Sequence, residues 1–317
     1  MYIMKKNIKI KALIIFILNI ITFSVSAQSN YMFVNAVINE NSEMNSEAKT
    51  YLENKLNQVI IKNSLIGNQA NARFIILANP IISSKDVLGT APTTVAMNIE
   101  LTFYFGDGIE GNKFSSYTMN LKGVDNNETK AYIAAFKNIK TDDQGLAKFI
   151  EDGKSGIIRY YNSQCSQIIS KAKSLQQREM YDEALNLLSS VPEACTQCYN
   201  QASPLLQSVY SAKIDYDCKK ILNEANMLWN ANQDSYTANT ISKMFSNVSP
   251  KAKCISEIKQ LGNRISSKIK ENDKREWDYV FAKDIELEKD KIKAIRDIGV
   301  AYGNGQPKTI VYNYKGW

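Results

Sequence analysis

The chain of 317 residues contains no histidine. This absence excludes Ser-His-Asp and Cys-His catalysis, zinc sites built on two histidines, and histidine-based pH switching. Enzymes without histidine can still use paired carboxylates or a Ser-Lys arrangement. The absence of histidine therefore lowers the expectation of catalysis but does not exclude it. We therefore predict a protein that is not an enzyme and that has no cofactor.

Long apolar runs are also missing, except near the start of the chain. There, residues 12–25 are almost wholly apolar, Val25-Ser26-Ala27 offers a signal peptidase site, and the preceding basic residues are Lys5, Lys6, Lys9 and Lys11. The pattern is typical of a signal peptide over residues 1–27, with a mature chain beginning near Gln28. The run is shorter than the roughly 20 residues of a membrane-spanning helix, and no cysteine follows it for lipid attachment. We expect a periplasmic or secreted protein with no integral membrane span after cleavage.

An excess of charge is lacking as well. The formal net charge is +7, and residues 1–27 contribute four lysines and no acid, which leaves +3 for the mature chain. This charge is small and scattered, so we expect no nucleic-acid partner. An envelope protein or peptide is the expected partner, and the oligomeric state stays open.

Residues 28–142 are predicted to form an α+β module. Strands are expected at 31–38, 72–81, 94–105 and 113–122, and an amphipathic helix at 46–65. A second helix is expected after Asp125, because Asp125 precedes Glu128 with the spacing of a capping box. The order β-α-β-β-β-α predicts a small sheet with helices on one face.

This order of elements, with the segments ARFIILANPI and LKGVDNNETKAYIAAFKNI, resembles the envelope module of the curli-secretion or TolB-N-terminal type. The resemblance covers residues 31–140 and carries no catalytic motif. It implies protein contacts and assembly at the outer membrane or in the periplasm. The chain lacks the lipid-anchor cysteine that many relatives carry, and a generic small α+β domain is the alternative.

Residues 143–275 are predicted to form a helical repeat region. The run from Cys165 to Leu175 parallels the run from Cys218 to Leu228. The separation of Ala172 from the Tyr-Asp-Glu-Ala-Leu run that follows it resembles that of the two helices of a tetratricopeptide repeat, which implies a groove for extended partners. The second helix is short, so a degenerate repeat and an ordinary antiparallel helical bundle both fit.

Residues 276–317 are predicted to form a charged helix and a strand-like tail. The helical pattern is expected to continue from Ile265 to Ile298. Gly303, Gly305 and Pro307 then break it, and residues 309–314 predict a final short strand.

The five cysteines are the leading candidates for chemistry, and all lie in the helical half: Cys165, Cys195, Cys198, Cys218 and Cys254. In an oxidising compartment disulfides are their default use. The repeat register pairs Cys165 with Cys198 or Cys195, and Cys218 with Cys254. The alternative with a specific chemistry is a redox CxxC motif at Cys195 and Cys198, but this motif lacks the usual strand-to-helix setting. A zinc site with only cysteine ligands is also possible, but the sequence lacks a second CxxC pair for it.

Three other groups of residues are expected to be structural. Acidic residues after Phe281 predict a solvated helix face with lysine pairs (Asp284, Glu286, Glu288 and Asp290). The glycines of the segment GDGIEG have the spacing of a dinucleotide fingerprint but join two strands, so they predict a hairpin loop (Gly106, Gly108 and Gly111). Five aromatic residues predict core packing, with a peptide-binding groove as the alternative (Tyr160, Tyr161, Trp229, Trp277 and Tyr279). No catalytic, cofactor-binding or metal-binding residue is assigned.

Three functions remain in view from the sequence. The favoured one is an exported envelope protein that acts as a non-enzymatic interaction or assembly factor. The second is a subunit of an outer-membrane secretion or pore complex, in which the hairpin of residues 94–105 and 113–122 would have to span a bilayer. The third is a periplasmic thiol oxidoreductase that uses Cys195 and Cys198.

Overall fold

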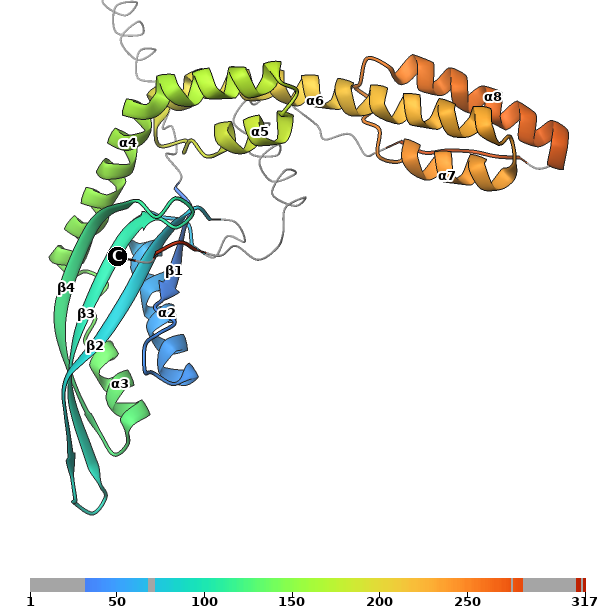
Figure 1. Ribbon diagram of the computed structural model, residues 1–317. Helices are drawn as coiled ribbons and strands as arrows, with labels where there is room; N and C mark the ends of the chain where they lie inside the picture. Colours follow the sequence, from blue (N-terminus) through green and yellow to red (C-terminus); the bar gives the residue numbers. More distant parts are fainter. Residues whose placement is uncertain (1–31, 68–71, 275, 282–311, 315) are drawn as a thin grey trace, which may run out of the picture. The chain divides into compact units, whose positions relative to one another are not determined.

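The structure is a computed structural model that describes residues 32–67, 72–274, 276–281, 312–314 and 316–317 (Figure 1). The predicted signal peptide and its cleavage site lie outside these residues, as do the four acidic residues after Phe281. The described part contains a four-stranded sheet and seven helices, so the α+β class predicted from the sequence is confirmed.

The sheet has the strand order β1-β2-β3-β4. Its strands are β1 (Val34–Ile38), β2 (Phe74–Leu88), β3 (Thr94–Asp107) and β4 (Lys113–Asp125). Helix α2 (Ser46–Lys62) connects β1 to β2, which pair in parallel, and the other two pairings are antiparallel. Strand β2 exceeds its predicted range most, because its exposed end, residues 83–88, pairs with the start of β3. Strands β3 and β4 extend to Asp107 and Asp125, slightly beyond their predicted ends.

Alternation along β3 explains why the helices cover one face of the sheet. The odd-numbered side chains from Val95 to Phe105 are buried, whereas even-numbered ones such as Asn98 and Glu100 are exposed. The buried side faces α2, α3 (Glu128–Lys137) and the start of α4 (Gln144–Gln177), as the period of two for a half-buried strand requires. This is the predicted layer arrangement.

The start of α3 differs from the capping box expected at Asp125. Asp125 is still part of β4, where it pairs with Val95. The N-cap is Asn127, whose side chain accepts a hydrogen bond from the backbone N–H of Lys130. Asparagine in extended conformation is a favourable cap, so the helix begins two residues later than the Asp-Glu spacing indicates.

The helical half contains α4 (Gln144–Gln177), α5 (Tyr181–Ser189), α6 (Thr196–Ala231), α7 (Ser235–Phe245) and α8 (Ile255–Asp273). Two three-helix bundles share α6. The first bundle joins the C-terminal half of α4 to α5 and the N-terminal half of α6. The second bundle joins the C-terminal half of α6 to α7 and α8.

The tetratricopeptide resemblance stays a prediction. Such repeats need a turn after each short helix, but α6 runs without a break from Thr196 to Ala231. The parallel between the two cysteine-containing runs instead places equivalent residues in two bundles that one long helix connects.

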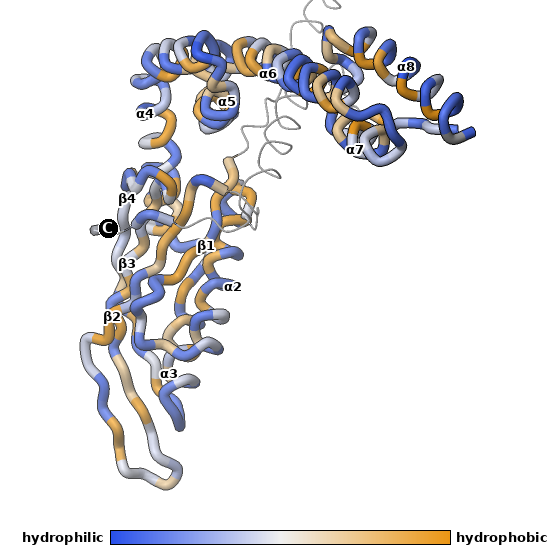
Figure 2. Tube along the Cα trace, turned by 45° about the vertical axis from the view of Figure 1, so that its right-hand side comes forward, coloured by the Kyte–Doolittle hydropathy of each residue, from blue (hydrophilic) through white to orange (hydrophobic). Residues whose placement is uncertain are grey.

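The two bundles belong to different hydrophobic cores. One continuous core extends from the sheet through α2, α3 and α4 into the first bundle, as far as Val209 of α6. A second, smaller core begins at Cys218 and includes Trp229, Phe245 and Ile265. In Figure 2 the hydrophobic residues of α8 recur between hydrophilic ones, the pattern of a helix with one buried face.

In the described part of the chain, the helix predicted over residues 265–298 ends early, and residues 282–298 of that prediction lie outside the described part. Helix α8 stops at Asp273, and Lys274 adopts a left-handed conformation with φ of 56°. Residues 276–281, which we call the aromatic segment, are not helical. Trp277, Tyr279 and Phe281 alternate there, which suits an extended segment with one face packed on the second bundle.

Candidate functional site

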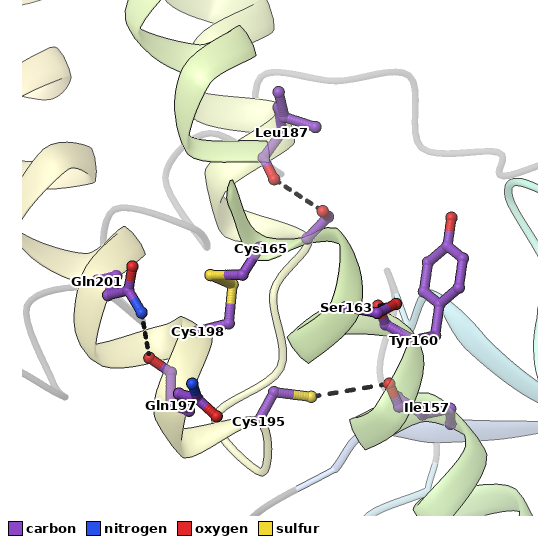
Figure 3. The surroundings of a disulfide bond; sticks show 10 residues. Ile157, Tyr160, Ser163, Cys165, Leu187, Cys195, Gln197, Cys198 and Gln201 are labelled. Atoms are coloured by element: carbon purple, nitrogen blue, oxygen red, sulfur yellow. Dashed lines mark hydrogen bonds between the residues drawn. A yellow bond between two sulfur atoms is a disulfide. The ribbon is translucent and has the colours of Figure 1, made fainter. Parts of the chain in front are cut away.

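Two disulfides hold the helical bundles. Cys165 of α4 is bonded to Cys198 of α6, with Cα atoms 5.4 Å apart, and Figure 3 shows this bridge between the two helices. Cys218 of α6 is bonded to Cys254, the N-cap of α8, with Cα atoms 6.1 Å apart. Both separations suit a disulfide. These are the pairs expected from the repeat register, one in each bundle.

Cys195 is the remaining thiol, and it is fully buried. Its sulfur lies 4.0 Å from the carbonyl oxygen of Ile157, to which the thiol donates (Figure 3). Burial raises the pKa of the Cys195 thiol to about 12. Because the thiolate is the reactive form, and because Cys198 is bonded to Cys165, the arrangement lacks the features of a redox CxxC.

Asp107 is a buried carboxylate that the sequence alone did not single out. One of its oxygens pairs with Arg73 Nε at 2.5 Å, and the other accepts from the backbone N–H groups of Ile109 and Glu110. Arg73 also contacts Glu110, with 2.7 Å between nitrogen and oxygen. With these partners Asp107 holds the β3–β4 turn in shape. Among the described residues, no group of cysteines and acids is arranged to hold a metal ion.

The glycine-rich turn between β3 and β4 lies under the C-terminal residues of the chain. A Cβ atom on Gly108 would stand 2.5 Å from the ring of Tyr312, and one on Gly106 would collide with the ring of Trp317. Gly111 has a φ of 77°, which glycine adopts without strain. The fingerprint-like spacing therefore marks a hairpin turn, as predicted, and the absent side chains make room for a packed segment.

Hydrogen bonds fix the C-terminal residues on this turn. The backbone N–H of Asn313 donates to the carbonyl of Gly108 at 2.6 Å, and Trp317 Nε1 donates to the carbonyl of Gly111 at 2.7 Å. The Tyr312 hydroxyl donates to the carbonyl of Ala72 at 3.1 Å and accepts from the Asn35 side chain at 3.2 Å. The short strand expected at residues 309–314 is thus replaced, where it is described, by a segment docked on the sheet.

A comparable docking occurs on the second bundle. Ser266 of α8 donates to the carbonyl of Trp277 at 3.2 Å, and Ser242 of α7 donates to the carbonyl of Asp278 at 3.3 Å. Gly262 of α8 lies so close to the Tyr279 ring that a Cβ atom would collide with it.

The aromatic rings of the segment form a chain along the bundle. The ring centroids of Trp277 and Tyr279 are 5.5 Å apart, and those of Tyr279 and Phe281 are 5.4 Å apart. Tyr279 also packs edge-on against Phe245 of α7 at 5.4 Å. The α7–α8 groove, defined by Ser242, Phe245, Gly262 and Ser266, therefore holds the aromatic segment by its main chain and by alternate rings.

The other predicted aromatic residues lie in or beside the cores. Tyr161 is buried against Phe74, with ring centroids 6.1 Å apart, and Trp229 is buried in the second core. Tyr160 is only partly buried, and its hydroxyl donates to Glu110 at 3.1 Å. Alternation at positions 277, 279 and 281 was the signal that could have revealed the docked aromatic segment.

Comparisons with known proteins assign no family to this arrangement. No protein-family model matches the chain, and a search of curated proteins finds no match. The resemblance to the curli-secretion module consequently stays a prediction.

Proposed function

We propose that the protein is exported to the cell envelope and acts there as a non-enzymatic interaction or assembly factor, whose helical region binds extended polypeptide segments. The observation that carries the proposal is the docking of the aromatic segment in the α7–α8 groove. Two serine hydroxyls donate to main-chain carbonyls of a non-helical segment. Such bonds hold any extended chain in place, while pockets for alternate side chains supply selectivity.

The composition of the groove supports this role. A glycine in the middle of a helix costs about 1 kcal/mol relative to alanine, yet Gly262 occupies α8 where the Tyr279 ring approaches most closely. The serine hydroxyls likewise bond to the aromatic segment rather than to their own helices. Together these residues fit an extended aromatic partner, here supplied by the chain itself.

Peptide binding in trans tests the proposal. The full chain carrying Trp277→Ala and Tyr279→Ala should lose its own occupant, and a labelled, end-blocked peptide of sequence EWDYVF should then bind saturably by fluorescence anisotropy. Adding Gly262→Leu to the same variant should abolish binding, and a peptide with alanine in place of tryptophan and tyrosine is the matched ligand control. Equal anisotropy with and without Gly262→Leu would contradict the proposed groove.

Export is supported by the two disulfides, which persist in oxidising compartments. In the described part of the chain, no helix has both the length and the apolar character needed to cross a membrane. Intact-mass measurement of envelope-extracted protein should give an N-terminus at or near Gln28. A retained Met1 would contradict export through a cleaved signal.

The two alternative functions receive less support. A thiol oxidoreductase needs an accessible thiolate, and the buried Cys195 with its raised pKa works against one. The hairpin required for a pore subunit lies within β3 and β4, where one face packs on helices.

A further inference from the structure

We propose that the α7–α8 groove selects extended segments with an apolar ring at the position of Trp277 and a tyrosine at the position of Tyr279, as in the pattern Phe-x-Tyr-x-Phe. The inference rests on the proposed function, because it names the class of peptide that the same groove takes. It concerns which side chains fit the groove, whichever chain supplies them. The observation behind it is a buried hydrogen-bond donor of the aromatic segment that has no partner.

The groove contacts alternate positions of the aromatic segment. The side chains of Trp277, Tyr279 and Phe281 pack on the second core. Those of Asp278 and Val280, which lie between them, are exposed. This is the period of two of an extended chain that lies on a surface. Selectivity for side chains therefore resides at the three packed positions, and the two positions between them accept charged and apolar residues alike.

The middle position is shaped for tyrosine. A Cβ atom on Gly262 would stand 2.6 Å from Cζ and 2.9 Å from the hydroxyl oxygen of Tyr279. The outer end of the ring, with its hydroxyl, thus lies over the glycine, and Phe245 packs edge-on against the same ring. Because any larger residue at position 262 would take this space, the middle ring sets the register of a bound segment.

The first position fits the shape of an indole but leaves its polar atom unpaired. Trp277 packs against Tyr279, with ring centroids 5.5 Å apart, and Ser266 donates to its main-chain carbonyl. The indole Nε1 is buried, and it has no hydrogen-bond partner among the described residues. This N–H is the only polar group of a tryptophan side chain, and burial of an unpaired donor costs its full desolvation. An apolar ring at this position avoids that cost.

Another docked tryptophan of the chain provides the contrast. Trp317 Nε1 donates to the carbonyl of Gly111 at 2.7 Å, so the docking of Trp317 pairs its indole N–H. The described surroundings of Trp277 offer no such acceptor. The groove therefore favours phenylalanine at the first position, because phenylalanine combines an aromatic ring with the absence of a polar side-chain atom.

Peptide affinities for the emptied groove test this preference. The full chain carrying Trp277→Ala and Tyr279→Ala is titrated with three labelled, end-blocked peptides, and binding is followed by fluorescence anisotropy. The peptides are EWDYVF, the same peptide with benzothienylalanine in place of tryptophan, and EFDYVF. Benzothienylalanine has the shape of tryptophan with sulfur in place of the N–H group. The benzothienyl peptide should bind at least about fivefold more tightly than EWDYVF, and EFDYVF should bind at least as tightly as EWDYVF despite its smaller ring.

Controls separate this inference from the proposed function. Far-UV circular dichroism checks folding, and Trp277→Ala alone serves if the double variant does not fold. The peptide EWDAVF lacks the middle ring and should bind more weakly than EWDYVF; equal binding would contradict the tyrosine position. If no peptide binds, the proposed function and this inference both fail. If EWDYVF binds as tightly as the benzothienyl peptide, or more tightly than EFDYVF, the selectivity is overturned and the proposed function stands.

Discussion

The two hydrophobic cores of the molecule differ in how they are closed. The larger core combines a sheet, whose strands pair over long sequence distances, with five helices. The smaller core is built by half of α6, by α7 and α8, and by the aromatic segment. Small cores bury less apolar area and are less stable alone. The second bundle therefore depends more on its disulfide and on the packed aromatic segment for stability.

The two disulfides differ in how much the stability of each bundle depends on them. They close loops with sequence separations of 33 and 36 residues, so the chain-entropy model assigns each about 3–4 kcal/mol. In the first bundle this contribution adds to a core that continues into the sheet. In the second bundle it adds to a small separate core, and local unfolding of that bundle is the expected consequence of its loss.

The largest effect on stability is expected from a cavity in the larger core, which the sheet and the first bundle share. Phe103→Ala empties a fully buried site on β3 and should cost about 3–5 kcal/mol of unfolding free energy. Urea unfolding followed by far-UV circular dichroism should shift. In a Trp317→Phe background, tryptophan fluorescence reports only Trp229 and Trp277 of the second bundle and should shift less. Phe245→Ala, in the second core, should reverse that order. Equal shifts in both signals for both variants would show one cooperative unit.

Removal of the disulfides is expected to follow in size. Cys218→Ala with Cys254→Ala should lower the stability of the second bundle by about 3–4 kcal/mol. The corresponding pair, Cys165→Ala with Cys198→Ala, is the matched control and should affect the first bundle and leave Trp229 fluorescence largely unchanged. Thermal melts recorded at both signals provide the comparison, and unaltered melts in both variants would show that neither bridge forms.

Substitution of Gly262, the glycine of the α7–α8 groove, should have a smaller effect on stability. Gly262→Ala places a Cβ atom against the Tyr279 ring, and overpacking of this kind costs about 1–3 kcal/mol. Helix propensity offsets up to about 1 kcal/mol of this cost. Trp277 fluorescence should shift as the aromatic segment moves, whereas Gly89→Ala, at an open position, should leave it unchanged. A Gly262→Ala protein with unaltered Trp277 emission would contradict the close docking.

The smallest effect concerns the buried thiol. Burial raises the pKa of Cys195 from 9.0 to about 12, so the folded state holds this proton more tightly than the unfolded state does. The resulting stabilisation is complete below pH 9 and is lost as the pH rises toward about 12. Buried tyrosines titrate in the same range, so the test is the difference in stability between wild type and Cys195→Ala. That difference should shrink from pH 9 to pH 11, and a constant difference would contradict the burial.

Much of the fold could be predicted because its elements carry local signals. The period of two in β3 and the helical spacing in α2 determined both elements and the face that each one buries. The cap of α3 was misplaced because Asp125 and Asn127 are both good caps, and only pairing of Asp125 with Val95 decides between them. The helix predicted beyond Asp273 was wrong over residues 276–281, because charged residues obscured the alternation at 277, 279 and 281.

The candidate sites were less accessible from sequence. The cysteine pairs followed from the repeat register, since equivalent residues occupy equivalent helices. The docking of the C-terminal residues on the β3–β4 turn did not follow from the sequence, because it joins Gly108 to Tyr312 across most of the chain and no local pattern encodes that contact. Asp107 was likewise missed, since its burial depends on Arg73 from another strand end.

Hydrogen exchange of the full chain, with and without reductant, tests the division into two cores most directly. Reduction should raise exchange in the C-terminal half of α6, in α7 and in α8, and should leave the amides of β2, β3 and β4 protected. Loss of protection in the sheet to the same extent, or no change in α7 and α8, would contradict the division.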